Sequence, residues 1–154
     1  MKPFALLLGL ILFVTGCNQG ADSGNDSAGM DSTPFVLEQA LEKAKEENKV
    51  VLLEFTGSDW CPPCKMLEKN VLSTDTFKQY ADASLVFGKL DFPRSKPQSP
   101  EVKKNNAQLS DQFNINAFPT LVLLAADGKE LWRQEGYGGE SARDLIARIE
   151  SKKK

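Results

Sequence analysis

Six consecutive residues, Val50 to Phe55, restrict the fold more than any other stretch, because five of them are apolar and Glu54 alone is charged. A short apolar run without alternation of polar residues is typical of a strand that is covered on both faces. Residues 50–55 are therefore expected to form a central strand with helices on each side. The length of 154 residues leaves room for one ordinary domain of this kind.

Apolar spacing and turn residues indicate further elements on either side of this strand. The first helix is expected to follow an N-cap at Ser32-Thr33, and a later one has capping-box spacing at Ser141 and Asp144. The order of elements predicts an α/β fold with a mixed sheet and helices on both faces. Helices are expected over about residues 35–48, 61–72, 75–81, 106–113 and 141–149, strands over 85–92, 120–125 and 130–134, and a surface loop over 93–104.

The N-terminus has the pattern of a secretion signal. An apolar run from Phe4 to Val14 follows Lys2, and its 11 residues fall short of the roughly 20 that a transmembrane helix needs. Val14-Thr15-Gly16-Cys17 resembles the bacterial lipoprotein box, in which the cysteine is lipidated and becomes the first mature residue. Residues 1–16 are therefore expected to be a lipoprotein signal peptide; an ordinary signal followed by an incidental cysteine is the alternative.

Residues 17–34 would then be a lipidated cysteine and a linker that precede a folded domain over residues 35–154. The linker consists mostly of Gly, Ser, Asp and Asn, a composition that cannot offset the entropy of ordering. Residues 1–34 hold one of the 19 basic and three of the 21 acidic residues, so residues 35–154 carry 18 of each sign. A neutral domain lacks the basic field that binds nucleic acid.

The chain contains no histidine. This excludes Ser-His-Asp and Cys-His nucleophile systems, histidine zinc sites and an imidazole proton switch. The remaining reactive side chains are three cysteines, of which Cys61 and Cys64 follow the central strand directly. Two cysteines at positions i and i+3 of a helix start lie close enough to form a disulfide, and the unpaired N–H groups there favour the thiolate of the first.

Three simpler explanations of the cysteine pair compete with a redox role. A zinc site needs four ligands, and it is nearly excluded because the chain has three cysteines and no histidine. A structural staple that closes four residues contributes only about 2 kcal/mol in the chain-entropy model. The third explanation is a cysteine pair that has no redox function.

Trp60-Cys61-Pro62-Pro63-Cys64-Lys65 after a strand, with Phe118-Pro119-Thr120 before a later strand, resembles the thioredoxin family over about residues 35–150. The resemblance implies a three-layer α/β/α sandwich with a central mixed sheet, and thiol–disulfide exchange. Cys61 would be the nucleophile, and Cys64 would attack the mixed disulfide to release the reduced substrate.

The position of Glu54 in an apolar strand calls for an explanation, because burying a carboxylate without a partner costs several kcal/mol. The family resemblance implies a catalytic carboxylate beneath Cys64 that relays its proton, paired with a lysine at Lys89. This alignment assumes one extra residue in the loop 56–60. The alternatives are that Glu54 ends the strand and points to water, and that Lys89 is solvated.

The resemblance also implies a substrate edge beside the cysteines. Pro119 is predicted to follow a cis peptide bond with Phe118, so that its backbone pairs with an extended substrate; the alternative is an ordinary trans proline. Trp60 and Phe118 are expected to contact the substrate, although Trp60 could simply pack. Ser58 and Asp59 are interpreted as solvated loop residues without a role.

The sequence thus predicts a lipid-anchored, monomeric thiol–disulfide oxidoreductase on the periplasmic side of the cell envelope, without cofactor or metal. Its partners would be protein thiols and disulfides and a membrane electron-transfer reductant. A reductase or isomerase is favoured, because Pro62-Pro63 lacks the histidine that strongly oxidising relatives place between the cysteines. The alternatives are a carrier that binds Cu(I) between Cys61 and Cys64, and a chaperone-like peptide binder that uses the Pro119 edge.

Overall fold

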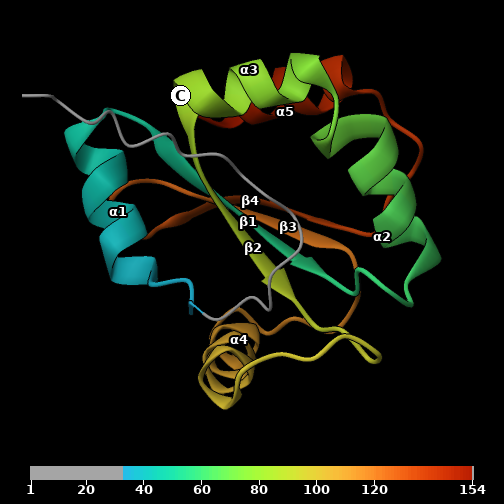
Figure 1. The fold of residues 1–154 in the computed structure, drawn as a ribbon. Helices are drawn as coiled ribbons and strands as arrows, with labels where there is room; N and C mark the ends of the chain where they lie inside the picture. The colour runs from blue at the N-terminus through green and yellow to red at the C-terminus, as the bar shows by residue number, and fades with distance from the viewer. Residues whose placement is uncertain (1–32, 154) are drawn as a thin grey trace, which may run out of the picture.

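The computed structural model describes residues 33–153 (Figure 1). The predicted signal peptide, the lipidated Cys17 and the linker up to residue 32 lie outside the described residues. Within residues 33–153, no helix is long and apolar enough to cross a membrane.

The centre of the fold is a four-stranded mixed sheet in the order β2-β1-β3-β4. Strand β1 (Val50–Thr56) runs parallel to β2 (Leu85–Asp91) and antiparallel to β3 (Thr120–Leu124), which pairs in turn with β4 (Glu130–Glu135). The prediction of a central strand is confirmed, because residues 51–56 are all buried. Its continuous apolar run follows from cover on both faces.

Helices cover both faces of the sheet, as Figure 1 shows. Leu53 and Phe55 of β1 point to one face, where they pack against α1 (Leu37–Glu46) and α4 (Pro100–Gln112). Leu52 points to the other face, in accordance with the two-residue period of a strand. The predicted three-layer α/β/α sandwich is confirmed. The second face packs against α2 (Pro62–Leu67), the π-helical turn η1 (Glu68–Leu72), α3 (Asp75–Ser84) and α5 (Ala142–Lys152).

The start of α4 corrects the prediction for residues 93–104. The helix begins at Pro100 instead of residue 106, because the Ser99 hydroxyl accepts a hydrogen bond from the Val102 N–H at 3.2 Å and Pro100 fits the first turn. The irregular segment is therefore shorter and spans residues 93–99.

Two other helices also differ from expectation. Helix α1 begins at Leu37 with Val36 at its N-cap, so Thr33 does not cap it, and Ser32 lies outside the described residues. The helix predicted over 61–72 passes into the wider turn η1, and Met66 just before this turn is 51% exposed. The predicted capping box of α5 is confirmed, since Ser141 and Asp144 bond each other's backbone N–H groups.

Candidate active site

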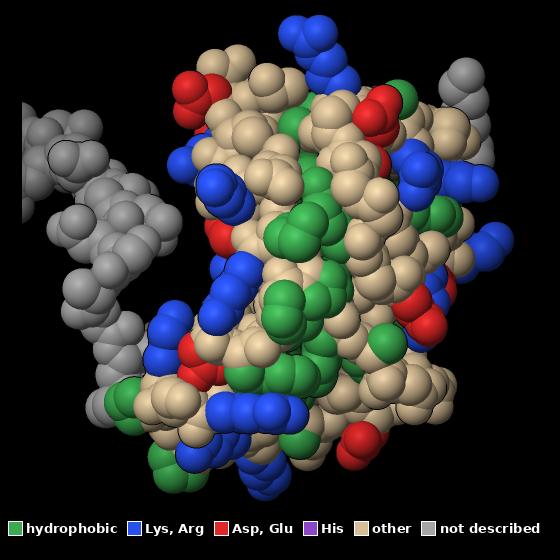
Figure 2. Space-filling view, turned by 90° about the vertical axis from the view of Figure 1, so that its right-hand side faces the viewer, with side chains coloured by type: hydrophobic (Ala, Val, Ile, Leu, Met, Phe, Trp, Pro, Cys, Tyr) green, Lys and Arg blue, Asp and Glu red, His purple; other side chains and the backbone are tan. Residues whose placement is uncertain are grey.

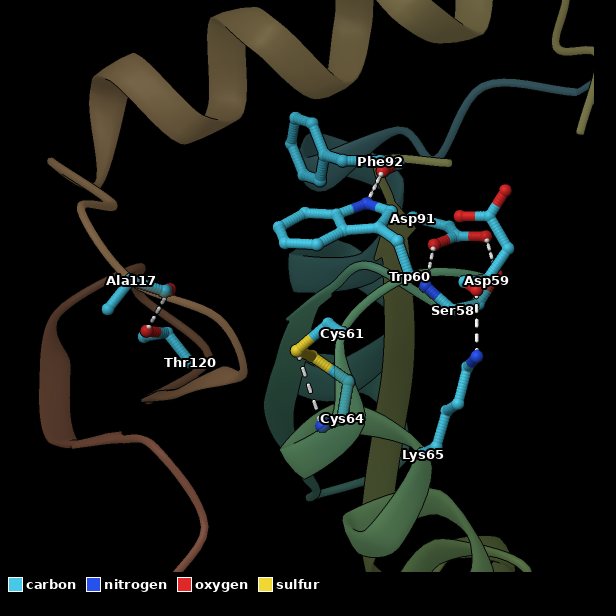
Figure 3. Close-up of a disulfide and its surroundings, with 10 residues drawn as sticks. All are labelled: Ser58, Asp59, Trp60, Cys61, Cys64, Lys65, Asp91, Phe92, Ala117 and Thr120. Atoms are coloured by element: carbon cyan, nitrogen blue, oxygen red, sulfur yellow. Dashed lines mark hydrogen bonds between the residues drawn. A yellow bond between two sulfur atoms is a disulfide. The ribbon is translucent and has the colours of Figure 1, made fainter. Parts of the chain in front are cut away.

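Cys61 and Cys64 form a disulfide at the point where β1 leads into α2 (Figure 3). Their Cα atoms are 5.3 Å apart, and the Cys64 N–H donates a hydrogen bond to Cys61 Sγ at 3.3 Å. Pro62 and Pro63 occupy the first turn, where missing N–H groups cost no helical hydrogen bond. Cys61 keeps 3% of its surface exposed and Cys64 keeps none, so Cys61 is the sulfur that another molecule reaches first.

Trp60 lies directly over the approach to Cys61. Its indole N–H donates a hydrogen bond to the Phe92 carbonyl at 2.8 Å. The indole packs so closely on Gly57 that a Cβ there would lie 2.5 Å from the ring, which explains the glycine. The Arg94 guanidinium lies 3.8 Å from the ring centroid on its outer side. Trp60 is therefore fixed by three contacts rather than free to move.

The loop before β3 also contacts Trp60. Phe118 packs edge-on against Trp60 with ring centroids 5.9 Å apart. Pro119 is buried and its peptide bond with Phe118 is cis, as predicted. The Thr120 hydroxyl donates to the Ala117 carbonyl at 2.8 Å and closes this loop, which Figure 3 shows beside the disulfide. The structure thus brings Trp60, Phe118 and Pro119 together at the cysteine pair.

Ser58 is not the solvated loop residue that the sequence suggested. Its N–H and its hydroxyl donate to the two oxygens of the Asp91 carboxylate at 2.8 and 2.6 Å. These bonds tie the loop after β1 to the end of β2. The pairing of β1 with β2 in register, Thr56 opposite Asp91, places the two groups side by side, which the sequence alone does not reveal.

Asp59 also has a structural role that the sequence analysis missed. Its carboxylate accepts hydrogen bonds from the N–H groups of Arg94, Ser95 and Lys96 at 2.6 to 3.2 Å. These bonds, with that from Ser95 the strongest cause, lower the pKa of the Asp59 carboxyl. Asp59 thereby fixes the segment 93–99 against the active-site loop and holds Arg94 over Trp60.

Glu54 lies on the face of β1 that packs under α2, and its side chain is fully buried. The expectation that Glu54 is buried is therefore confirmed, and the alternative that it points to water is wrong. Neither carboxylate oxygen has a hydrogen-bond partner, and Lys89 Nζ lies 4.0 Å from Oε2. Burial raises the pKa of Glu54 to about 7, although the charge of Lys89 opposes the rise. A carboxyl group with this pKa exchanges a proton readily near neutral pH.

Lys89 lies on β2 directly opposite Glu54 on β1, and its side chain extends toward the Glu54 carboxylate. Its ammonium donates a much shorter hydrogen bond, 2.6 Å, to Glu68 Oε2 of η1. Glu68 was not singled out from the sequence, although it follows Cys64 by four residues and so falls on the same helical face.

A cavity of about 390 Å³ is shared by Lys89, Glu68 and Cys64. It is partly open, so it connects the residues that line it with solvent. Its lining consists of Thr56, Ser58, Cys64, Lys65, Glu68, Lys69, Ser73 and Lys89.

The outer surface at this end of the molecule carries apolar side chains among polar and charged ones (Figure 2). Figure 2 shows a band of hydrophobic side chains that runs down this face, with Lys and Arg side chains along its left border. Among residues 33–153, no cluster of three or more Cys, Asp or Glu side chains has a metal-binding arrangement.

Comparison with known proteins defines the class of this protein. Residues 37–152 match the family model described as a thioredoxin-like domain. The chain therefore belongs to the thioredoxin-like family.

Within the family, the relatives carry disulfide-exchange names. Disulfide bond reductase DsbH of Chlamydia pneumoniae is 34% identical over 113 residues, which cover 73% of this chain and 68% of that protein. Thioredoxin-related protein DsbJ of the same organism is 29% identical over 147 residues, 94% of this chain but 41% of that protein. A solved structure described as DsbH oxidoreductase superimposes with a TM-score of 0.70 at 28% identity, covering 86% of this chain and 92% of that one.

This chain is a thiol–disulfide oxidoreductase of that family, as the fold, the cysteine pair and these relatives together show. The alternative of a Cu(I) carrier finds no support, because the three relatives described above are named for disulfide or thioredoxin chemistry.

Proposed function

We propose that this protein reduces or isomerises disulfide bonds of client proteins outside the cytoplasm, held to a membrane by a lipid on Cys17. The observation that carries the proposal is the half-shielded cysteine pair, in which Cys61 is reachable and Cys64 is fully buried. A DsbH relative that is named a disulfide bond reductase supports the reducing direction.

The reaction begins with the reduced pair. The Cys61 thiolate attacks one sulfur of the client disulfide, a bond forms between Cys61 and that sulfur, and the other client sulfur leaves as a thiolate. The Cys64 N–H, which donates to Cys61 Sγ in the disulfide, is placed to stabilise the thiolate as well.

Cys64 then resolves the mixed disulfide. Glu54 accepts the proton of the Cys64 thiol, and the resulting thiolate attacks Cys61 Sγ. The Cys61–Cys64 disulfide forms, the second client sulfur leaves as a thiolate, and two electrons have passed to the client. An external dithiol carrier, for which a membrane electron-transfer protein is the natural source, returns the pair to its reduced form.

The client is held by the apolar surface around Cys61. Trp60 and Phe118 offer flat rings, and the backbone at Pro119 offers an edge with which an extended segment can pair. The side chains of Pro62 and Pro63 bring no charge next to the reacting sulfur. This supports a broad preference for unfolded or extended client segments rather than for one particular folded client surface.

The location rests on the N-terminal sequence. Residues 1–16 match a lipoprotein signal and Cys17 stands at its lipidation position. Two acyl chains on Cys17 would anchor the domain stably, whereas one chain binds a membrane only marginally. A linker of about 16 residues gives the domain a reach of about 20 to 24 Å from the bilayer.

A trapping experiment tests the function. In a Cys64→Ala variant, the mixed disulfide through Cys61 cannot be resolved. Client proteins should therefore accumulate as covalent complexes, which a reductant cleaves. The complexes are detected by non-reducing gel electrophoresis, and their partners are identified by mass spectrometry.

Two further variants sharpen the result. The Cys61→Ala/Cys64→Ala pair is the matched control and should trap nothing. A Cys61→Ser variant should lose biological activity, whereas full activity in that variant would show a peptide binder instead of an oxidoreductase. Equal trapping by the double variant would overturn the proposed function.

A further inference from the structure

The ion pair between Lys89 and the buried Glu54 is incomplete. Lys89 Nζ stands 4.0 Å from Glu54 Oε2 but 2.6 Å from Glu68 Oε2. A separation of 4.0 Å is too long for a hydrogen bond, so both Glu54 oxygens stay unbonded while fully buried. The lysine that opposes the Glu54 charge is thus committed mainly to another carboxylate.

Glu68 is itself held in place from two directions. Its Oε1 accepts a hydrogen bond from the Ser73 hydroxyl at 2.5 Å, and its Oε2 accepts one from Lys89. Although partial burial opposes the effect, these hydrogen bonds lower the pKa of Glu68, so its carboxyl is ionised at neutral pH. The π-helical turn η1 widens the helix after α2 and carries Glu68 at its first position.

We propose that Glu68 is a positioning residue, which holds the Lys89 ammonium away from Glu54 and thereby sets the pH range in which Glu54 takes the proton of Cys64. This inference rests on the proposed function, in which Glu54 accepts that proton. Three of the four residues, Cys64, Glu68 and Lys89, line the same cavity, so the groups act on one another across a short, partly enclosed space.

Other charged groups around Glu54 do not offer Lys89 a competing partner at this distance. The charge of Asp91 of β2 acts on both Glu54 and Lys89, but the Asp91 carboxylate accepts its hydrogen bonds from Ser58. Strand β3 places the apolar Leu121 opposite Glu54. Lys65 and Lys69 line the cavity, and Lys65 donates to the Asp59 carbonyl at 2.7 Å.

A Glu68→Gln variant tests the proposal. Without the Glu68 charge, Lys89 is free to approach Glu54, and its ammonium then favours the ionised carboxyl. The titration midpoint of Glu54, followed by NMR of its side-chain carboxyl carbon, should move to lower pH by about one unit. The rate at which Cys64 resolves a mixed disulfide should rise below pH 7 and change little above pH 8.

Repeating the titration in a Lys89→Met variant separates the positioning of Lys89 from a direct effect of the Glu68 charge on Glu54. If Glu68 acts through Lys89, the shift caused by Glu68→Gln should largely disappear in that background. An equal shift in both backgrounds, or no shift in either, overturns the proposal. Glu130→Gln is the matched control, because it removes a carboxylate from an exposed pair with Arg133 and should leave the midpoint unchanged.

The titration does not depend on client reduction. If Cys64→Ala traps no client while Glu68→Gln still moves the Glu54 midpoint through Lys89, the proposed function fails and the positioning of Lys89 stands. If trapping succeeds and the midpoint does not move, the function stands and this inference fails.

Discussion

At the scale of the residue, Glu54 decides the proton chemistry of the site. Its carboxyl group is fully buried, and the rise of its pKa is opposed mainly by the charge of a lysine 4.0 Å away and less by the Thr56 side chain. The folded protein therefore favours the protonated form, and the pKa of Glu54 is about 7 instead of the ordinary 4.5. A raised carboxyl pKa in the folded state means that the folded protein binds the proton more tightly than the unfolded chain.

The stability of the protein should therefore fall as the pH rises from about 4.5 through 7. The loss from Glu54 amounts to at most about 3.5 kcal/mol, since its pKa rises from 4.5 to about 7 and each unit of pKa corresponds to about 1.4 kcal/mol. A Glu54→Gln variant cannot ionise, so its stability relative to the wild type should be greater at pH 8.5 than at pH 5. Urea unfolding at both pH values measures the difference.

The exposed Glu38→Gln on α1 serves as the control and should show no such difference between the two pH values. A Glu54→Gln variant whose stability relative to the wild type is the same at pH 5 and pH 8.5 would contradict the buried, proton-binding state of Glu54.

At the scale of the element, the segment 93–99 is attached to the active-site loop by hydrogen bonds. The Asp59 carboxylate accepts hydrogen bonds from three of its backbone N–H groups, and Trp60 contacts both Arg94 and Phe118. A loop with so few apolar contacts of its own depends on such polar anchors for its order.

Asp59→Ala should therefore release this segment without unfolding the domain. The amides of Arg94, Ser95 and Lys96 lose their acceptor, and their hydrogen exchange should accelerate by about tenfold or more. Exchange measured by NMR checks this. The matched control is Asp82→Ala on α3, which should leave these three amides unchanged, and unaltered exchange in the Asp59 variant would show that other contacts order the segment.

At the scale of the whole molecule, stability comes from the two apolar layers on either side of the sheet. The disulfide closes only four residues and contributes about 2 kcal/mol at most in the chain-entropy model. Leu145 of α5, by contrast, is completely buried between helix and sheet. The fold is thus expected to survive the reduction that its chemistry requires.

Leu145→Ala should lower the free energy of unfolding by about 2 to 5 kcal/mol, because it removes apolar contacts and leaves a cavity. Reduction of the Cys61–Cys64 disulfide should cost less than this. Denaturant unfolding of the oxidised, reduced and variant proteins compares the two, with the exposed Met66→Ala as a control near zero. A reduced protein less stable than the Leu145 variant would contradict this view.

Several features followed from the sequence because they depend on neighbours along the chain. The capping box of α5 and the cysteine pair at a helix start are set by residues three positions apart. The start of α4 was also encoded locally, in Ser99-Pro100, but the many polar residues around it suggested a loop. The helix predicted over 61–72 was wrong in part, because it passes into the π-helical turn η1.

The sequence by itself determined the class of fold and the identity of the reacting sulfurs, because both depend on apolar periodicity and on short spacings. Only the tertiary structure decided which side chains surround those sulfurs. Glu54, Glu68 and Lys89 meet because β1 pairs with β2 in one register while η1 crosses above them. Such meetings depend on packing between distant segments, and the distances of 2.6 and 4.0 Å that set the proton chemistry exist only once the chain is folded.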